Sequence, residues 1–216
     1  MLRDLSLERS VCNHFIAEIR DVDVQKDPLR FRRNLERIGE VMGYEISKLM
    51  DYDPQNVTTP LGKIDQMLMK NQPVIVSILR AGLTIHQGML NYFDRAENAF
   101  VSAYRKPHGN SDEIEVEVEY IACPDLEGKE LILCDPMLAT GTSLILAYEA
   151  LIERGTPSKV HVACAIASNV GIRTIQKHLP DNTTIHCGAI DPELNDMSYI
   201  VPGLGDAGDL AYGAKQ

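Results

Sequence analysis

The chain has 216 residues, of which 44% are hydrophobic, and its formal net charge is −10 at pH 7. This length can bury one sizeable core, so we expect a single domain over residues 1–216. The negative charge repels polyanions and weighs against a nucleic-acid-binding surface. With no apolar run near the roughly 20 residues of a membrane span and no secretory signal at the start, we expect a cytoplasmic protein without a membrane partner.

The first element that the pattern predicts is a helix from Asp27 to Met50. Asp27 suits the cap position and Pro28 suits the first turn, where its missing N–H costs nothing. Apolar side chains then recur at helical spacing, at Leu35, Ile38, Met42, Ile46 and Leu49. This stripe should cover one face of the core.

From Pro73 to Leu179 short apolar runs alternate with amphipathic stretches. Alternation of strands and helices predicts an α/β fold in which a mostly parallel open sheet has helices on both faces. Ligands bind such sheets at the carboxyl ends of the strands, and Arg80 ends one of the predicted strands. An arginine there could also extend to solvent, but its place favours a role in binding.

Two segments differ from this pattern. Residues 104–123 contain a polar tip followed by EIEVEVEYIA, whose strict alternation predicts a β-hairpin that projects from the sheet. We interpret it as a lid over the site, and the alternative is a rigid edge hairpin that mediates subunit contact. Residues 197–216 are rich in glycine without helical period, which predicts a loop assembly.

The most informative segment is ELILCDPMLATGTS, residues 130–143, where an apolar strand ends at an acid and a small-residue loop leads into a helix. Backbone amides of residues 139–142, the hydroxyls of Thr140 and Ser143 and the helix N-terminus can together hold a phosphate. Asp135 would repel phosphate and is placed to accept hydrogen bonds from ribose hydroxyls. An ordinary strand-to-helix turn is the alternative.

The DPMLATGTS segment resembles the phosphoribosyl pyrophosphate (PRPP) loop of type I phosphoribosyltransferases, and its Asp-Pro opening is the uracil-specific form. The similarity continues in TPLG at 59–62, SILRAGL at 77–83, Tyr104-Arg105 and YIVPGLGDAGD at 199–209. This resemblance to uracil phosphoribosyltransferases implies conversion of uracil and PRPP to UMP and diphosphate in pyrimidine salvage. It also implies Mg²⁺ as a cofactor and a homodimer or larger homo-oligomer.

The resemblance assigns site residues as well. It implies catalytic roles for Asp206, Asp135 and Arg105. Uracil would be bound by Ile200, Gly205, Asp206 and Ala207. PRPP would be bound by Arg80, Arg105, Asp135, Pro136, Met137, Leu138, Ala139, Thr140, Gly141, Thr142, Ser143 and Asp206. Mg²⁺ would be held mainly by PRPP and water, since it uses few protein carboxylates, so we expect no protein metal site.

Three places depart from the family pattern, one of them Ser168-Asn169-Val170-Gly171, where Ala-Pro-Glu-Gly is more usual. Thr142 stands where a glycine is usual, so the loop requires a threonine to adopt the local backbone angles. Leu210 stands where a cation is usual, which puts activation by GTP in doubt. Three alternatives stay open: a regulator of pyrimidine genes with the same fold, a phosphoribosyltransferase for another base, and a binding module without activity.

Overall fold

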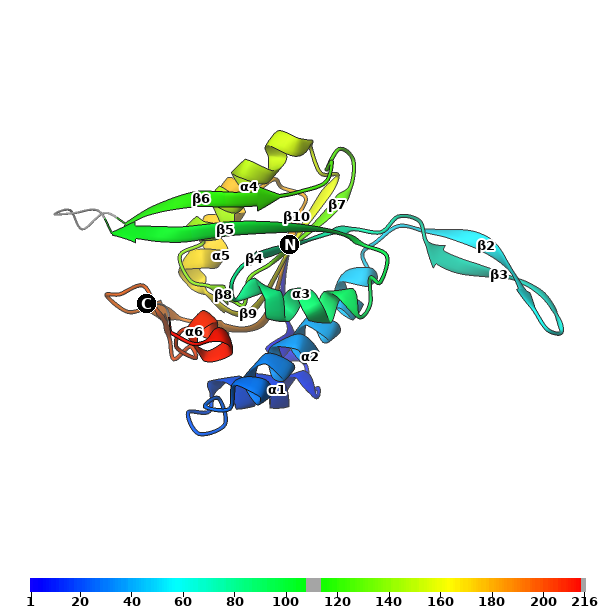
Figure 1. The fold of residues 1–216 in the computed structure, drawn as a ribbon. Helices are drawn as coiled ribbons and strands as arrows, with labels where there is room; N and C mark the ends of the chain where they lie inside the picture. The colour runs from blue at the N-terminus through cyan, green and yellow to red at the C-terminus, as the bar shows by residue number, and fades with distance from the viewer. Residues whose placement is uncertain (108–113, 215–216) are drawn as a thin grey trace.

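The computed structural model describes the backbone of residues 1–107 and 114–214 and the side chains of residues 1–102 and 119–214. A mixed sheet forms its centre (Figure 1). Its strands lie in the order β1 (Leu2–Asp4), β10 (Thr183–Asp191), β9 (Lys159–Ser168), β7 (Glu130–Cys134), β4 (Val74–Leu79), β5 (Glu97–Pro107) and β6 (Ile114–Ala122). The short β8 (Met137–Leu138) also pairs with β9. Along this path the pairs are parallel except β5 with β6, so the predicted fold class is confirmed.

Helices cover both faces of the sheet and define two apolar cores (Figure 1). The first core contains α1 (Cys12–Arg20), α2 (Pro28–Ser47) and α3 (Gly82–Leu90), and the second contains α4 (Thr142–Leu151) and α5 (Asn169–His178). Successive residues of β4 show why its run is wholly apolar: Ile75 enters the first core, whereas Val74 and Val76 enter the second.

The long predicted helix corresponds to α2, which ends three residues earlier than expected. The Asp27 side chain accepts hydrogen bonds from the N–H groups of Leu29 and Arg30, as the cap prediction requires. The predicted stripe is buried as far as Ile46, with Phe31 added at its start. Helix α1 was not predicted, because its nine residues are too few for a helical repeat of apolar residues to be recognised in the sequence.

A second hairpin, β2 (Tyr52–Thr59) with β3 (Gly62–Met69), projects from the body as an arm on the side away from α6 (Figure 1). The sequence interpretation missed it, because Pro54 and an irregular polar pattern hide the alternation of a strand. The TPLG motif forms its turn, where Thr59 Oγ1 accepts hydrogen bonds from the N–H groups of Leu61 and Gly62. This motif therefore lies far from the end of the sheet that α6 covers.

The predicted hairpin of residues 104–123 is present as the antiparallel pair of β5 and β6. Its tip, residues 108–113, lies outside the described residues. In the tail, β12 (Ile200–Val201) pairs with β11 (Glu193–Leu194), and α6 (Ala207–Tyr212) follows. The prediction of loops alone was therefore wrong here. Six residues are too few for a visible period, and the helix depends on a local cap in which Asp206 accepts the N–H of Asp209.

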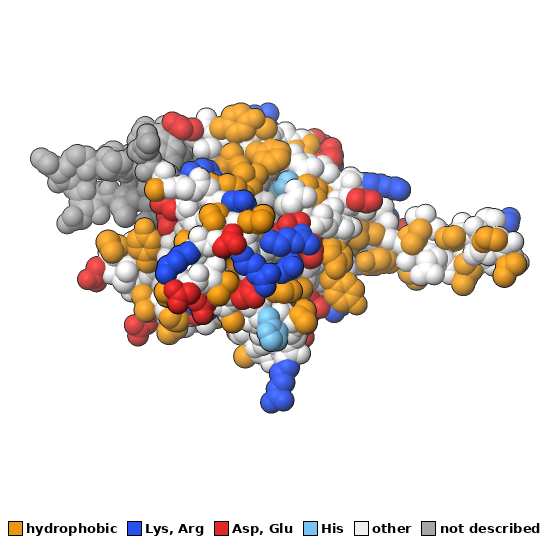
Figure 2. Space-filling model, turned by 60° about the horizontal axis from the view of Figure 1, so that its bottom comes forward, with side chains coloured by type: hydrophobic (Ala, Val, Ile, Leu, Met, Phe, Trp, Pro, Cys, Tyr) orange, Lys and Arg blue, Asp and Glu red, His pale blue; other side chains and the backbone are white. Residues whose placement is uncertain are grey.

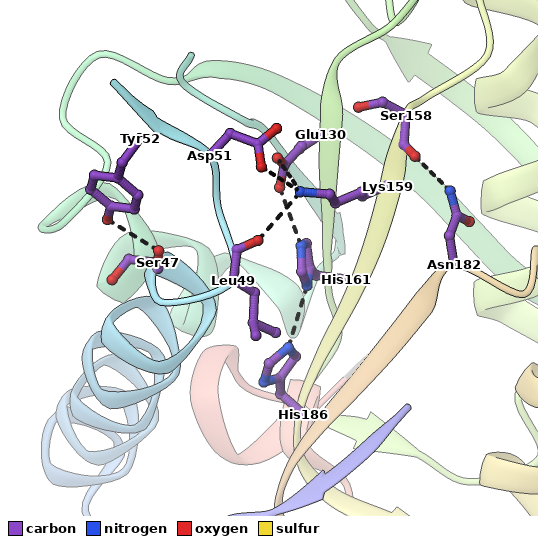
Figure 3. A network of polar contacts seen from close by, with 10 residues as sticks. All are labelled: Ser47, Leu49, Asp51, Tyr52, Glu130, Ser158, Lys159, His161, Asn182 and His186. Carbon is purple, nitrogen blue, oxygen red and sulfur yellow. Dashed lines mark hydrogen bonds and ion pairs between the residues drawn. The ribbon is translucent and has the colours of Figure 1, made fainter. Parts of the chain in front are cut away.

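A network of polar side chains joins the amino-terminal ends of β7 and β9 to the end of α2 (Figure 3). Lys159 Nζ lies 3.2 Å from Glu130 Oε1 and 3.3 Å from both Asp51 Oδ1 and the Leu49 carbonyl. Glu130 Oε2 lies 3.4 Å from Nε2 of buried His161, whose Nδ1 lies 3.4 Å from Nε2 of buried His186. Burial lowers the pKa of His186 to about 3. The network ties α2 and the root of the arm to the sheet.

Among the described residues, no helix is both long and apolar enough to cross a bilayer. The five cysteines are free thiols, and four of them are buried. Burial raises the pKa of the Cys12 thiol to about 11, which keeps it protonated and unreactive.

Candidate active site

A cleft of about 450 Å³ opens where β4 and β7 end, and the tail closes its other side. Its walls combine residues 78–81, at the end of β4 and just after it, with residues of the loop after β7 and of the tail. Nine sequence-predicted residues line it: Arg80, Asp135, Met137, Ala139, Ser143, Ile200, Gly205, Asp206 and Ala207. Seven more were not assigned from the sequence: Ile78, Leu79, Ala81, Met197, Ser198, Tyr199 and Gly208.

The predicted phosphate loop leads directly into α4. Gly141 takes a left-handed conformation, with φ of 86°, at the position before the helix. Thr142 is the first residue of the helix and does not share that conformation, so a threonine fits where glycine is usual. The N-terminal amides of a ten-residue helix therefore face the end of the loop, as an anion site requires.

Contacts from β9 and α5 hold the loop from behind. Ser168 Oγ donates to the Ala139 carbonyl at 2.5 Å and accepts the N–H of Gly171 at 2.8 Å. A Cβ on Gly171 would lie 2.6 Å from the Ala139 carbonyl oxygen and 2.7 Å from that of Leu138. Glycine is required at position 171 because the loop backbone approaches it so closely.

The remaining loop residues do not line the cleft with their side chains. Leu138 is buried in the second core, and the carbonyl of Pro136 accepts the N–H of Ile166. Thr140 turns its hydroxyl toward Thr142, with 3.1 Å between the two Oγ1 atoms. What the loop offers to a ligand at residues 136, 138 and 140–142 is therefore mainly its backbone and the hydroxyls at the start of α4.

Asp135 follows the last residue of β7 and faces the cleft. Its Oδ1 accepts the N–H of Met137 at 3.2 Å, which fixes the carboxylate. Burial raises the pKa of Asp135 to about 6, and the bond from Met137 opposes this only in part. The carboxylate is thus ionised at neutral pH but protonates more readily than an exposed aspartate.

Arg80 follows β4 and reaches across the mouth of the cleft to α6. Its Nη2 donates to Asp209 Oδ1 at 3.0 Å and to the Gly213 carbonyl at 3.1 Å. Its Nε is buried and has no hydrogen-bond partner among the described residues. Within the part of the chain that the structure describes, only Nη2 of this guanidinium is paired, so other donors beside the cleft remain for an anionic ligand.

The tail is shaped by local hydrogen bonds. Asn195 Oδ1 accepts the N–H groups of Met197 and Tyr199, and this turn places Ser198 in a left-handed conformation with φ of 61°. Gly205, with φ of 94°, has no heavy atom within 4 Å of the position of a Cβ, so its main chain is open to the cleft. Asn195 was not assigned from the sequence, although Asn in a turn between apolar residues is a recognisable signal.

Arg105 lies on β5, where it pairs in register with Val116. Its side chain is outside the described part of the chain, so its predicted contact with PRPP stays a prediction. The predicted absence of a protein metal site is likewise untested for the whole chain. Among the described residues, no three His, Cys, Asp or Glu side chains are grouped so that they could hold a metal ion.

Known proteins match this chain over most of its length. The family model for uracil phosphoribosyltransferase matches residues 6–214. A curated uracil phosphoribosyltransferase from Porphyromonas gingivalis is 55% identical over 211 residues, which are 98% of this chain and 97% of the relative. One from Pyrococcus furiosus is 38% identical over 201 residues, covering 92% of this chain and 84% of the relative.

Solved structures give the same fold. A protein from Aquifex aeolicus superposes with a TM-score of 0.87 at 31% identity, over 99% of this chain and 98% of the other. A hypoxanthine phosphoribosyltransferase from Staphylococcus aureus, at 16% identity, has a TM-score of 0.50 over 76% of each chain. The second likeness supports the fold alone.

Proposed function

Since this chain belongs to the uracil phosphoribosyltransferase family, a group of glycosyltransferases that make UMP and diphosphate from uracil and PRPP, we propose that the cleft between the phosphate loop and the tail is its active site. The observation that carries this proposal is that one cleft is lined both by Arg80, Asp135 and Ser143 and by four tail residues, Ile200, Gly205, Asp206 and Ala207. The side formed by the loop and Arg80 would contact the anionic groups and the ribose. The side formed by the tail would present its main chain to a flat base.

We propose that the loop and the N-terminus of α4 bind the 5-phosphate of PRPP, while Arg80 and Arg105 bind its diphosphate. The reaction displaces diphosphate from the anomeric carbon through a state with positive charge on the ribose. Asp135 would hold the ribose hydroxyls, and Asp206 would lie near the reacting carbon. Cations that neutralise the leaving diphosphate lower the barrier without any covalent nucleophile.

Mg²⁺ fits this site as a partner of PRPP. The cleft presents two carboxylates, Asp135 and Asp206, and hard oxygen donors in small number are what Mg²⁺ takes from a protein when phosphates and water supply the rest. When bound, the ion would supply positive charge to the diphosphate oxygens. The protein would contribute mainly the orientation of PRPP.

Uracil would be read by the main chain of Ile200, Gly205 and Ala207. Backbone donors and acceptors cannot exchange roles, so this arrangement favours uracil over cytosine, whose N3 and exocyclic group reverse the pattern. A base other than uracil is therefore the less favoured alternative.

We further propose that the chain self-associates through the β2–β3 arm. An isolated two-stranded hairpin has little stability in water, yet this one exposes apolar side chains along its length (Figure 2). They include Leu61, which is fully exposed, and Ile64 and Met67, which are more than half exposed. Sedimentation of the intact chain should give a dimer or larger species, and Ile64→Lys with Met67→Lys should shift it toward monomer.

The β5–β6 hairpin stays our proposal for a lid, on the strength of its sequence pattern. Closure would exclude water from the activated ribose carbon. Shortening residues 107–113 should lower turnover and raise the fraction of PRPP that is hydrolysed for each UMP formed. Unchanged turnover and partition would favour the edge-hairpin alternative.

We also propose a cytoplasmic location, which suits free thiols such as the Cys164 and Cys187 pair.

The proposed function is tested by incubating the purified chain with uracil, PRPP and Mg²⁺ and measuring UMP and diphosphate. Equal amounts of the two products are expected. Product formation with hypoxanthine or cytosine at a comparable rate would contradict the assignment of the base.

A further inference from the structure

An ion pair behind the tail joins two residues that are 171 positions apart in the sequence. Arg20 ends α1, and Asp191 ends β10. Arg20 Nη1 lies 2.7 Å from Asp191 Oδ2 and Nη2 lies 2.8 Å from Oδ1, so the guanidinium grips both carboxylate oxygens. The side chains are 22% and 6% exposed, which makes this a largely desolvated pair.

The same two side chains hold both polar groups of one tail residue, Gly203. Arg20 Nη1 donates to the Gly203 carbonyl at 2.9 Å, and Asp191 Oδ2 accepts the Gly203 N–H at 2.8 Å. Gly203 has φ of 58°, and a Cβ there would lie 2.1 Å from the carbonyl oxygen of Ile200. The ion pair is therefore bound to the turn that folds back onto Ile200.

Stability alone is a weak reason for such a pair. Removing two charges from water costs several kcal/mol, and well-packed apolar residues of similar volume are often as stabilising. What a bidentate pair adds is direction, because a planar guanidinium and a carboxylate fix each other's orientation. Here the oriented pair also fixes the N–H and the carbonyl of Gly203 through hydrogen bonds, and Gly203 lies between Ile200 and Gly205 in the sequence.

We propose that Arg20 and Asp191 are positioning residues for base recognition, which they serve by fixing the main chain of residues 200–205 through Gly203. Neither residue lines the cleft, so they act through the tail. This inference rests on the proposed function, in which Ile200 and Gly205 read uracil. Main-chain recognition needs such support, because a displacement of about 1 Å in a binding group can cost on the order of a hundredfold in rate.

The variants Arg20→Lys and Asp191→Asn test the proposal. Lysine keeps the positive charge but cannot make the two parallel hydrogen bonds of the guanidinium. Asparagine keeps the shape of aspartate but loses the negative charge. We expect the KM for uracil to rise by about tenfold or more in both, while the KM for PRPP at saturating uracil changes less than about twofold. The preference for uracil over cytosine should fall, which a merely structural role would not produce.

A matched control exists on the same helix. Glu18 of α1 makes a bidentate pair with Arg30 of α2, at 2.6 and 2.7 Å, and among the described residues neither side chain hydrogen-bonds to the tail. Glu18→Gln and Arg30→Lys should leave both KM values unchanged. If a single variant of the Arg20 pair fails to fold, the double variant Arg20→Met with Asp191→Asn removes both charges together and should show the same rise for uracil.

Folded variants with an unchanged KM for uracil, or with equal rises for uracil and PRPP, would overturn the inference. The wild-type chain in the same assay separates this from failure of the proposed function. A wild-type chain that forms no UMP overturns the function and the inference with it. A wild-type chain that forms UMP at the same uracil KM as the variants overturns the inference alone.

Discussion

Nη2 of Arg80 lies 3.0 Å from Oδ1 of Asp209, and the two side chains are 36% and 37% exposed. The cation that we assign to diphosphate is thus paired with an acid of the tail. Asp209 is itself fixed, because its N–H donates to Asp206 Oδ1. Residues on the PRPP side and the uracil side of the cleft are therefore connected through one ion pair.

This pairing predicts that Asp209→Asn binds PRPP more tightly. Loss of the competing charge frees Arg80 and removes a nearby negative charge that repels diphosphate. Because the pair is partly exposed and screened by solvent, the gain should be modest, about twofold to fivefold in Kd. Calorimetric titration with PRPP and Mg²⁺ measures it. Glu153→Gln, an exposed change of equal charge near the end of α4, controls for net charge. Weaker binding by Asp209→Asn would show that Asp209 supports Arg80 instead of competing for it.

The pKa of Asp135 near 6 predicts an acid limb in the pH profile. The carboxylate must be ionised to accept two ribose hydroxyls, so kcat/KM for PRPP should fall as the pH drops through about 6. An aspartate with the usual pKa of about 3.9 would lose activity only at much lower pH. Since a phosphate also ionises near 6, the control is Asp135→Asn. The pH profile of this variant should show only the ionisation of the substrate phosphate. If wild type and variant had identical pH profiles, the acid limb would not be due to Asp135.

The buried His186 predicts acid lability of the fold. Its pKa is about 3 in the folded chain, against roughly 6.5 when unfolded, so between these values the unfolded state binds the extra proton. The free energy of unfolding should therefore be fully retained above pH 6.5 and fall below it, by at most about 1.4 kcal/mol per pH unit from this group. Urea unfolding of wild type and His186→Gln between pH 7 and 5 measures the slope. An equally steep slope in the variant would assign the lability to groups other than His186.

Main-chain recognition of the base predicts strong discrimination against cytosine. Groups that pair with the N3 donor and O4 acceptor of uracil would be left unpaired by cytosine, and such mismatches are worth up to about 10⁴ in kcat/KM. Competition between the two bases for PRPP, followed by separation of UMP and CMP, gives the ratio directly. A ratio within tenfold of one would contradict reading by the main chain of residues 200–207.

Features that depend on residues close together in the sequence could be predicted better than features that depend on distant residues. Local signals were predicted well: the Asp27 cap, the buried run of β4 and the turn at Gly141 each follow from neighbouring residues. The β2–β3 arm was missed because, apart from Met69 at its root, its residues are exposed, so its strands carry no regular apolar alternation. Helix α6 was missed because six residues show no period.

Pairings between distant residues could not be predicted at all. Nothing near Arg20 in the sequence indicates that Asp191 will meet it, and Asp209 gave no sign that it would bind Arg80. Both contacts exist only because β4, β10 and α1 bring their ends to one side of the sheet. The resemblance assigned residues to substrate binding, whereas the structure adds contacts that hold those residues in place.

The central claim, that PRPP is bound by the loop after β7, is tested most directly by kcat/KM for PRPP in Asp135→Asn and Gly141→Val. Asparagine removes the charge that meets the ribose, and valine cannot easily adopt the φ of 86°. Losing a contact of roughly 1.5–3 kcal/mol should lower kcat/KM about tenfold to a hundredfold while thermal unfolding of Asp135→Asn changes little. Wild-type kinetics in both variants would contradict the account.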